Sequence, residues 1–259
     1  MWLLERRRDV LRIGRQRAEY WGSTASGLEM HAALTLRAEP GAAESLEAEL
    51  HDWLQAFAGE ASRANRVDVV LESAWLPIML IEVGRHALGR GQVERLARHR
   101  LAQLHLPPGV SADDWGLRLD HRPGDVHAMG YGLAPSTRQA VLDAMTAVGR
   151  RAASLQPAWA WARQRLARRG SGLRTGWWGW VEQDRALLGR LERGRVTALN
   201  AGARVPGDEG ELARLFAVEA ARCGLREGDA ALMTRWQDLA ATKVKSPDGA
   251  TSSVLEAAA

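Results

Sequence analysis

Residues 174–201 have the sequence RTGWWGWVEQDRALLGRLERGRVTALNA, and this tryptophan-rich stretch decides the fold. Its side chains over residues 177–182 fall into two alternating sets, as expected of a β-strand. Residues 183–184 and 193–194 each predict a turn. We therefore predict two or three short antiparallel strands that form a meander.

The tryptophans of this meander are divided between the two faces of one strand. Trp178 and Trp180 share a face, and Trp177 points to the opposite one. One face is expected in the core; the other is either covered as well or exposed as an anchor, because tryptophan is enriched at interface hot spots. Candidate partner-binding residues are these three tryptophans and four residues that precede them, Trp159, Trp161, Arg163 and Arg165.

The composition is ordinary for a globular protein of the cytoplasm. Of its 259 residues, 46% are hydrophobic and 25% charged, and the formal net charge is +4. Lys243 and Lys245 are the only lysines, so the arginine excess indicates a coding bias more than nucleic-acid recognition. Cys223 is the only cysteine, which excludes a disulfide framework and fits a reducing compartment. No apolar run approaches the roughly 18 residues that cross a bilayer.

One order of elements is predicted twice along the chain. Three strands, an amphipathic helix and a buried strand are expected at residues 9–14, 17–21, 31–37, 42–57 and 66–71. A meander, a helix opened by Asp208 and Glu211, and a strand recur over residues 176–234. We therefore predict an α/β protein with two RNase H-like lobes, each with a mixed sheet of the five-stranded type, the second lobe being shortened.

Between these repeats, further elements predict an inserted subdomain. A strand over residues 75–83, a helix from residue 91 and a hairpin around Arg122-Pro123-Gly124-Asp125 are expected there. Ser136 and Gln139 are predicted to form a capping box at the start of the next helix. The expected domains are residues 1–170 with an insertion at about 75–133, residues 171–240, and a flexible tail, 241–259.

This plan resembles the actin-like ATPase fold, and within it the PilM and GspL proteins of type IV pilus and type II secretion systems. The likeness spans about residues 9–234 and is carried by hydrophobic patterns in three segments, Val10–Gly14, Val67–Trp75 and Ser136–Ala160. The resemblance implies a cytoplasmic protein that docks a short peptide of an inner-membrane partner in a groove between subdomains.

The chain departs from the active members of that wider fold at both phosphate loops. Those members place a carboxylate and a glycine in the first strand and turn, followed by small hydroxyl residues. Here Arg12 stands at the carboxylate's position, and residues 15–17 are Arg-Gln-Arg. A cation cannot ligate Mg²⁺, and the second loop, Glu182–Arg185, has no glycine for close backbone approach. We expect a pseudo-ATPase with no catalytic residues and no cofactor.

Two other chemistries are weighed and set aside. A nuclease of this fold needs several converging carboxylates, and only Asp9 and Asp68 lie near the right strands. His99 and His105 point about 240° apart on one helix, so they are not expected to share a face, and no metal site is predicted.

Two arginine-rich regions, around residues 85–105 and 150–174, are expected mainly as solvated faces, with Glu94 pairing with Arg98 at i, i+4. Contact with anionic membrane lipid or an acidic partner is the next interpretation, and nucleic acid is less favoured.

The leading hypothesis is a non-catalytic cytoplasmic scaffold of a type IV pilus or type II secretion-like machine, at the inner face of the bacterial inner membrane. It would dock on an inner-membrane assembly protein; self-association into a homodimer is left open. The alternative is a nucleotide-dependent or nucleic-acid-acting enzyme of the RNase H-like fold that uses the arginine-rich faces.

Overall fold

The structure, a computed structural model, describes residues 8–24, 27–57, 65–84, 88–106, 109–122, 124–168, 170, 173–204, 214, 216–218, 221–222, 224 and 231–240. The chain divides into two compact units. The first comprises Met1–Leu76, Leu133–Trp161 and Ala240–Lys243, and the second comprises Pro77–Gly132, Ala162–Leu239 and Val244–Ala259.

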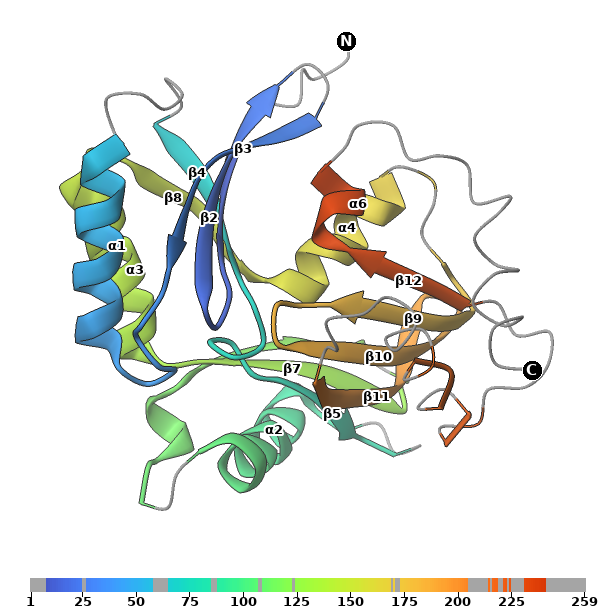
Figure 1. The fold of residues 1–259 in the computed structure, drawn as a ribbon. Helices are drawn as coiled ribbons and strands as arrows, with labels where there is room; N and C mark the ends of the chain where they lie inside the picture. Colours follow the sequence, from blue (N-terminus) through green and yellow to red (C-terminus); the bar gives the residue numbers. More distant parts are fainter. Residues whose placement is uncertain are drawn as a thin grey trace, which may run out of the picture. The chain divides into compact units, whose positions relative to one another are not determined.

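The first unit is built on a five-stranded sheet of order β3-β2-β1-β4-β8 (Figure 1). Its strands are β1 (Asp9–Ile13), β2 (Arg17–Thr24), β3 (Gly27–Thr35), β4 (Arg66–Leu71) and β8 (Arg151–Pro157). β1, β2 and β3 form an antiparallel meander, and β4 and β8 run parallel to β1. Helices α1 (Ala43–Phe57) and α3 (Pro135–Ala147) pack side by side and bury their apolar faces against the sheet (Figure 1).

The second unit contains two smaller sheets. The four-stranded one has the order β11-β10-β9-β12 and is formed by β9 (Gly176–Val181), β10 (Arg185–Glu192), β11 (Arg195–Arg204) and β12 (Ala231–Arg235). The three-stranded one has the order β5-β7-β6 and is formed by β5 (Ile78–Glu82), β6 (Gly116–Asp120) and β7 (His127–Leu133).

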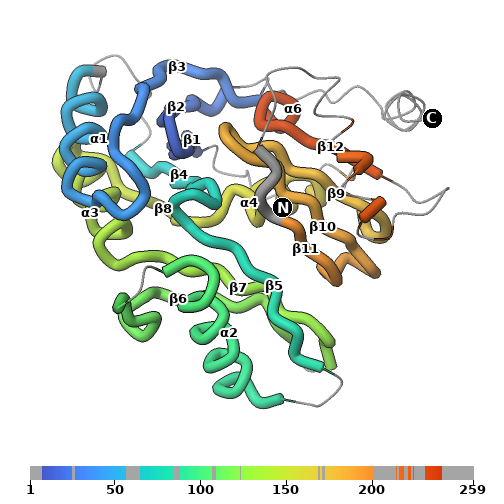
Figure 2. Tube along the Cα trace, turned by 60° about the horizontal axis from the view of Figure 1, so that its bottom comes forward, coloured from blue at the N-terminus to red at the C-terminus, as the bar shows by residue number. Residues whose placement is uncertain are grey.

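Four of the described helices lie wholly or mainly in this second unit. Helix α2 (Arg90–His105) lies beside the three-stranded sheet (Figure 2) and buries Val93, Ala97 and Leu101 against β5. The short helix η1 (Ala112–Asp114) follows it. Helix α6 (Trp236–Ala240) continues directly from β12, and helix α4 (Ala158–Arg168) continues from β8 across the boundary between the units.

The predicted duplication is confirmed at the level of topology. The order β3-β2-β1-β4 of the first sheet recurs as β11-β10-β9-β12 in the second. The first turn of each meander also closes in the same way, because the Gly14 N–H donates to the Arg17 carbonyl at 2.9 Å and the Glu182 N–H donates to the Arg185 carbonyl at 2.9 Å. The start of the helix predicted from Asp208 and Glu211 lies outside the described residues, as does Cys223, but residues 214, 216–218 and 221–222 within it are helical.

Three local predictions are wrong. Helix α3 begins at Pro135 after Ala134, which makes no side-chain cap bond, so no Ser136–Gln139 capping box opens it; proline suits the first helical position because its fixed φ is helical. The strand predicted at residues 17–21 continues as far as Thr24. The strand predicted from residue 75 begins at Ile78, because the Trp75 and Leu76 amides instead donate to the Glu72 carbonyl and form a turn.

Candidate functional site

Three charged side chains meet inside the first unit, at the end of β1. Arg12 is only 4% exposed. Its Nε donates to Glu72 Oε1 at 2.8 Å, its Nη2 donates to the same oxygen, and its Nη1 donates to Glu19 Oε2 at 3.1 Å. Both carboxylates are buried, so the guanidinium is held by charge-assisted hydrogen bonds out of water.

The sheet register explains how these three residues come together. Arg12 on β1 lies directly opposite Glu19 on β2. Ile13 pairs with Leu71, so Glu72 follows β4 at the same end of the sheet, and its N–H donates to the Ile13 carbonyl at 2.9 Å. Burial lowers the pKa of Arg12, but the charges of Glu72 and Glu19 and their hydrogen bonds raise it more, so the pKa is raised overall.

A second buried polar cluster lies on the same strands. The Tyr20 hydroxyl donates to Asp9 Oδ2 at 2.8 Å, and the Ser23 N–H donates to Asp9 Oδ1 at 3.0 Å. The guanidinium of Arg150 donates to the Tyr20 hydroxyl oxygen and lies 4.7 Å from the ring centroid. Asp9, which was weighed as a nuclease acid, is therefore engaged by an internal donor set.

The turn after β1 carries no hydroxyl side chain. It is closed by the Gly14–Arg17 hydrogen bond, and the Gly14 carbonyl accepts from Trp75 Nε1 at 2.8 Å. Arg15 pairs with Glu39 at 3.3 Å, and Arg17 pairs with Glu19 at 3.4 Å. The two arginines of the turn therefore have intramolecular carboxylate partners.

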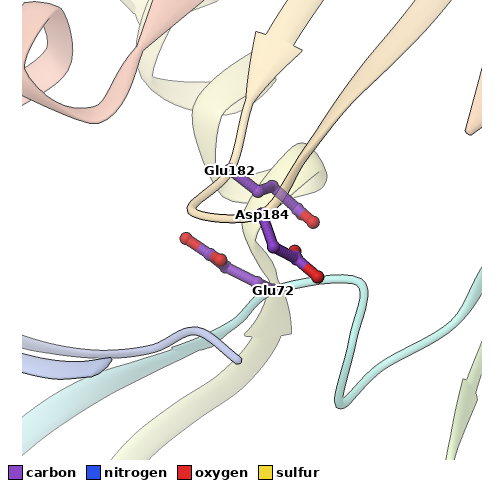
Figure 3. A group of neighbouring side chains, drawn as sticks. All are labelled: Glu72, Glu182 and Asp184. Carbon is purple, nitrogen blue, oxygen red and sulfur yellow. The ribbon is translucent and has the colours of Figure 1, made fainter. Parts of the chain in front are cut away.

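The corresponding turn of the second unit is acidic. Glu182 and Asp184 lie between β9 and β10 and are drawn in Figure 3 together with Glu72, which follows β4 of the first unit. Glu182 is buried, and Asp184 forms an ion pair with Arg185 at 3.1 Å. The turn predicted at residues 183–184 is confirmed, and its backbone contains no glycine.

The tryptophans predicted for partner binding all have buried side chains. Trp177, Trp178 and Trp180 are each at most 1% exposed, and Trp159 and Trp161 are also buried. Neither face of β9 therefore presents an indole at the surface. The reason is that strand β9 is covered on both faces, since all six of its residues are buried.

The two arginines predicted for partner binding are half-buried and make structural contacts. Arg163 Nη2 donates to the Gly194 carbonyl at 2.7 Å, and Arg165 Nε donates to the Leu239 carbonyl at 2.7 Å. Both bonds fix the end of α4 within the second unit. Partner binding by these arginines stays a prediction.

The basic region on α2 is less uniform than its sequence indicates. The predicted pair of Glu94 and Arg98 is confirmed at 2.9 Å. His99 and His105, which are not expected to share a face of the helix, both line one cavity with His127. The cavity extends past the edge of the helix to β5 and β11, and residues on different sides of α2 reach it.

Glu19 and Glu72 were not predicted as partners of Arg12. Tyr20 and Arg150 were not predicted in the cluster with Asp9. One signal was available. Arg12 lies between Leu11 and Ile13 in a strand that is buried throughout, and a buried charge requires a paired and hydrogen-bonded partner.

No protein-family model matches the chain, and no curated protein matches its sequence. Solved structures do match. The PilM–PilN type IV pilus biogenesis complex aligns with a TM-score of 0.60 at 14% identity, over 97% of this chain and 86% of that one. A Bacteroides thetaiotaomicron protein with an actin-like ATPase fold and unknown function aligns with a TM-score of 0.54 at 10% identity, over 91% and 84%. This chain has the actin-like ATPase fold.

The cytoplasmic domain of EpsL, an inner-membrane component of the Vibrio cholerae type II secretion system, aligns with this actin-like chain as well. Its TM-score is 0.50 at 17% identity, over 88% of this chain and 82% of that domain. The expected resemblance to the pilus and secretion proteins is therefore confirmed for the fold. None of the helices in the described part of the chain combines the length and the apolar character needed to span a membrane.

Proposed function

We propose that this actin-like chain is a non-catalytic scaffold at the cytoplasmic face of a type IV pilus or type II secretion-like machine, where it docks on the cytoplasmic segment of an inner-membrane assembly protein. The fold likeness to PilM in its complex with PilN and to the cytoplasmic domain of EpsL supports this class. The first belongs to a type IV pilus biogenesis complex, and the second to an inner-membrane component of a type II secretion system.

The ion cluster of Arg12 is the observation that carries the non-catalytic part of the proposal. Active members of the fold need a carboxylate on the first strand to position water on Mg²⁺. Here that position holds a guanidinium, bound by Glu72 and Glu19. A fixed internal cation opposes the approach of Mg²⁺ to these carboxylates by like-charge repulsion.

Nucleotide chemistry provides the first test. Mg·ATP at millimolar concentration is expected to leave the melting temperature unchanged and to release no phosphate above the rate without protein. A thermal shift accompanied by turnover would refute the non-catalytic assignment. A shift without turnover would limit the proposal to a nucleotide-binding scaffold.

Partner recovery provides the second test. The chain, cross-linked in cells of its source bacterium and purified from the membrane fraction, is expected to retain one inner-membrane assembly protein. Deletion of the gene is expected to abolish pilus assembly or secretion, and the wild-type gene should restore it. Recovery of single-stranded nucleic acid in place of a membrane protein would favour the enzymatic alternative.

A further inference from the structure

A cavity of about 720 Å³ lies within the second unit, beside α2. All five residues of β5 line it, together with residues of α2, the first residue of β7, and Leu199 and Asn200 of β11. The β11 wall is anchored next to it, because Arg195 at the start of β11 pairs with Asp120 at 3.3 Å and Asp125 at 3.0 Å on the β6–β7 hairpin. The cavity is thus bounded by elements of one compact unit.

Two of these walls are sheet edges. Among the described strands, β5 pairs only with β7, and β11 pairs only with β10. An edge strand presents a row of backbone N–H and C=O groups that can pair with another chain. The two strands also contact each other, so an extended segment would pair with the part of the β5 edge that this contact leaves open, the arrangement used in β-augmentation.

The α2 wall presents a stripe of three exposed side chains at i, i+4 and i+8. Leu96 is 41% exposed and Leu104 is 52% exposed, which is unusual for leucine in an amphipathic helix. Arg100 lies between them, is exposed, and has no ion-pair partner among the described residues. Its neighbour Arg98, by contrast, is bound by Glu94 and by the carbonyl of Ala112.

The charge of the cavity favours an anionic occupant. Arg100, His99, His105 and His127 line it, against one acidic residue, Glu82. Partial desolvation lowers the pKa of His105, and the charges of Arg185 and Arg100 lower it further. A carboxylate placed beside Arg100 would offset the electrostatic repulsion between Arg100 and a protonated His105.

The spacing of Leu96, Arg100 and Leu104 along α2 predicts the sequence pattern of a segment that binds there. Positions four apart on a helix rise about 6 Å, and alternate residues of an extended strand rise about 6.7 Å. We propose that this cavity binds an extended acidic segment of a partner protein, with the pattern aliphatic-x-acid-x-aliphatic, as an added strand along the edge of β5. The acid meets Arg100, and the two aliphatic side chains meet Leu96 and Leu104. This proposal rests on the proposed function in one respect only, the identity of the partner protein that supplies the segment.

A peptide assay tests the recognition directly. The probe is fluorescein-labelled Ser-Leu-Thr-Glu-Thr-Leu-Ser with blocked ends, titrated with the full chain and followed by fluorescence anisotropy. Arg100→Glu is expected to weaken binding by at least about tenfold, because it replaces an attraction with a repulsion. Arg95→Glu is the matched control, since Arg95 is exposed on the same helix but outside the cavity, and it should change binding less than about twofold.

A charge swap supplies the decisive arm. The peptide with Lys in place of Glu should bind the wild type weakly and the Arg100→Glu variant better. Equal losses in Arg95→Glu and Arg100→Glu, or no rescue by the swap, would overturn the pattern-specific site. If Arg100→Glu instead converts a dimer of the chain to monomer in sedimentation and no peptide binds, the occupant is a second copy, and the partner proposal is wrong.

The two proposals fail separately. Specific peptide binding without recovery of a membrane partner would leave the cavity assigned and refute the scaffold role. Recovery of a membrane partner that Arg100→Glu does not release, together with absence of peptide binding, would refute the cavity and leave the scaffold role in place.

Discussion

The two repeated sheets fill equivalent positions with opposite chemistry. Their strand registers align Arg12 with Trp180 on the first strand of each meander and Glu19 with Leu187 on the second. The fourth strands align in the same way, so Glu72 after β4 corresponds to Trp236 after β12. One unit therefore places a buried ion cluster where the other places two indoles and a leucine, and all six side chains are buried.

The comparison shows that the topology does not require the ions. A buried ion cluster repays its desolvation only with good geometry, and replacement by well-packed apolar groups is often neutral or stabilising. The second unit carries out that replacement within the same chain. We infer that the sheet of the first unit does not require these charges for its stability. They are present because this fold provides a polar site at the end of its first strand.

Breaking the ion cluster on one side should have the largest effect. Glu72→Ala leaves Arg12 buried with Glu19 as its remaining carboxylate partner in the cluster. We expect a loss of about 3–5 kcal/mol in the free energy of unfolding, because two buried N–H groups of the guanidinium, on Nε and Nη2, lose their charged acceptor. Denaturant unfolding followed by tryptophan fluorescence measures it.

The control makes the first unit resemble the second. Arg12→Met, Glu19→Leu and Glu72→Leu together remove all three charges, and this variant should recover most of the stability that Glu72→Ala loses. A triple variant less stable than the single one would show that the cluster stabilises the unit by itself, contrary to our inference.

The next largest loss of stability is expected from overpacking a buried glycine, not from a change of charge. Leu11 of β1 corresponds to Gly179 of β9, where a Cβ would lie 2.4 Å from Phe216 Cε2. Gly179→Ala should therefore destabilise by about 1–3 kcal/mol through overpacking. Combined with Phe216→Leu, it should cost less than the sum of the two single changes, and a double-mutant cycle measures the coupling. Additive losses would mean that the ring does not occupy the space of the missing side chain.

The local parts of this architecture were predictable, and the non-local parts were not. The turn at residues 193–194 follows from local backbone chemistry, since Arg193 has φ 52° and Gly194 has φ 79°, as a tight hairpin turn requires. The Glu94–Arg98 pair follows from helical spacing alone. The order of the strands along the chain follows from hydrophobic patterns, which repeat in both halves.

The partners of Arg12 depend instead on register across three strands, and residues 60 apart meet there. No spacing rule predicts such a meeting without the sheet order. The burial of Trp180 is equally non-local, because a strand alone cannot show whether both its faces are covered. The stripe Leu96-Arg100-Leu104 is visible in the sequence, but its place beside the edges of β5 and β11 is not.

A smaller effect is expected at a single buried hydrogen bond. Val10 and Val70 of the first sheet correspond to Trp178 and Thr234 of the second, where Trp178 Nε1 donates to Thr234 Oγ1 at 3.1 Å. Thr234→Val copies the first sheet and removes the acceptor, so a loss of about 1–2 kcal/mol is expected. Thr234→Ser keeps the hydroxyl and serves as the control. If Thr234→Val costs no stability, the hydrogen bond from Trp178 makes no net contribution.

The smallest effect at neutral pH, and the one that separates the two units by pH, concerns the only two tyrosines, Tyr20 and Tyr131. Burial raises the pKa of Tyr131 to about 12. Burial and the adjacent Asp9 raise the pKa of Tyr20 further, against the opposing charge of Arg150. An unfolded tyrosine has a pKa of about 10, so both groups stabilise the fold below that pH. This stability should be lost as the pH rises from about 10 through each folded pKa.

Ultraviolet absorbance of tyrosinate should therefore show little ionisation of the folded chain near pH 10. Tyr131→Phe should flatten the fall in unfolding free energy up to about pH 12. Asp9→Asn should lower the pKa of Tyr20 and leave Tyr131 unchanged, because Asp9 contacts only the tyrosine of the first unit among the described hydrogen bonds. Ionisation of both tyrosines near pH 10 in the folded chain would contradict their burial. A shift of both by Asp9→Asn would show that the polar site of the first unit acts on the second, and the contrast between the two sheets would then no longer be one of independent cores.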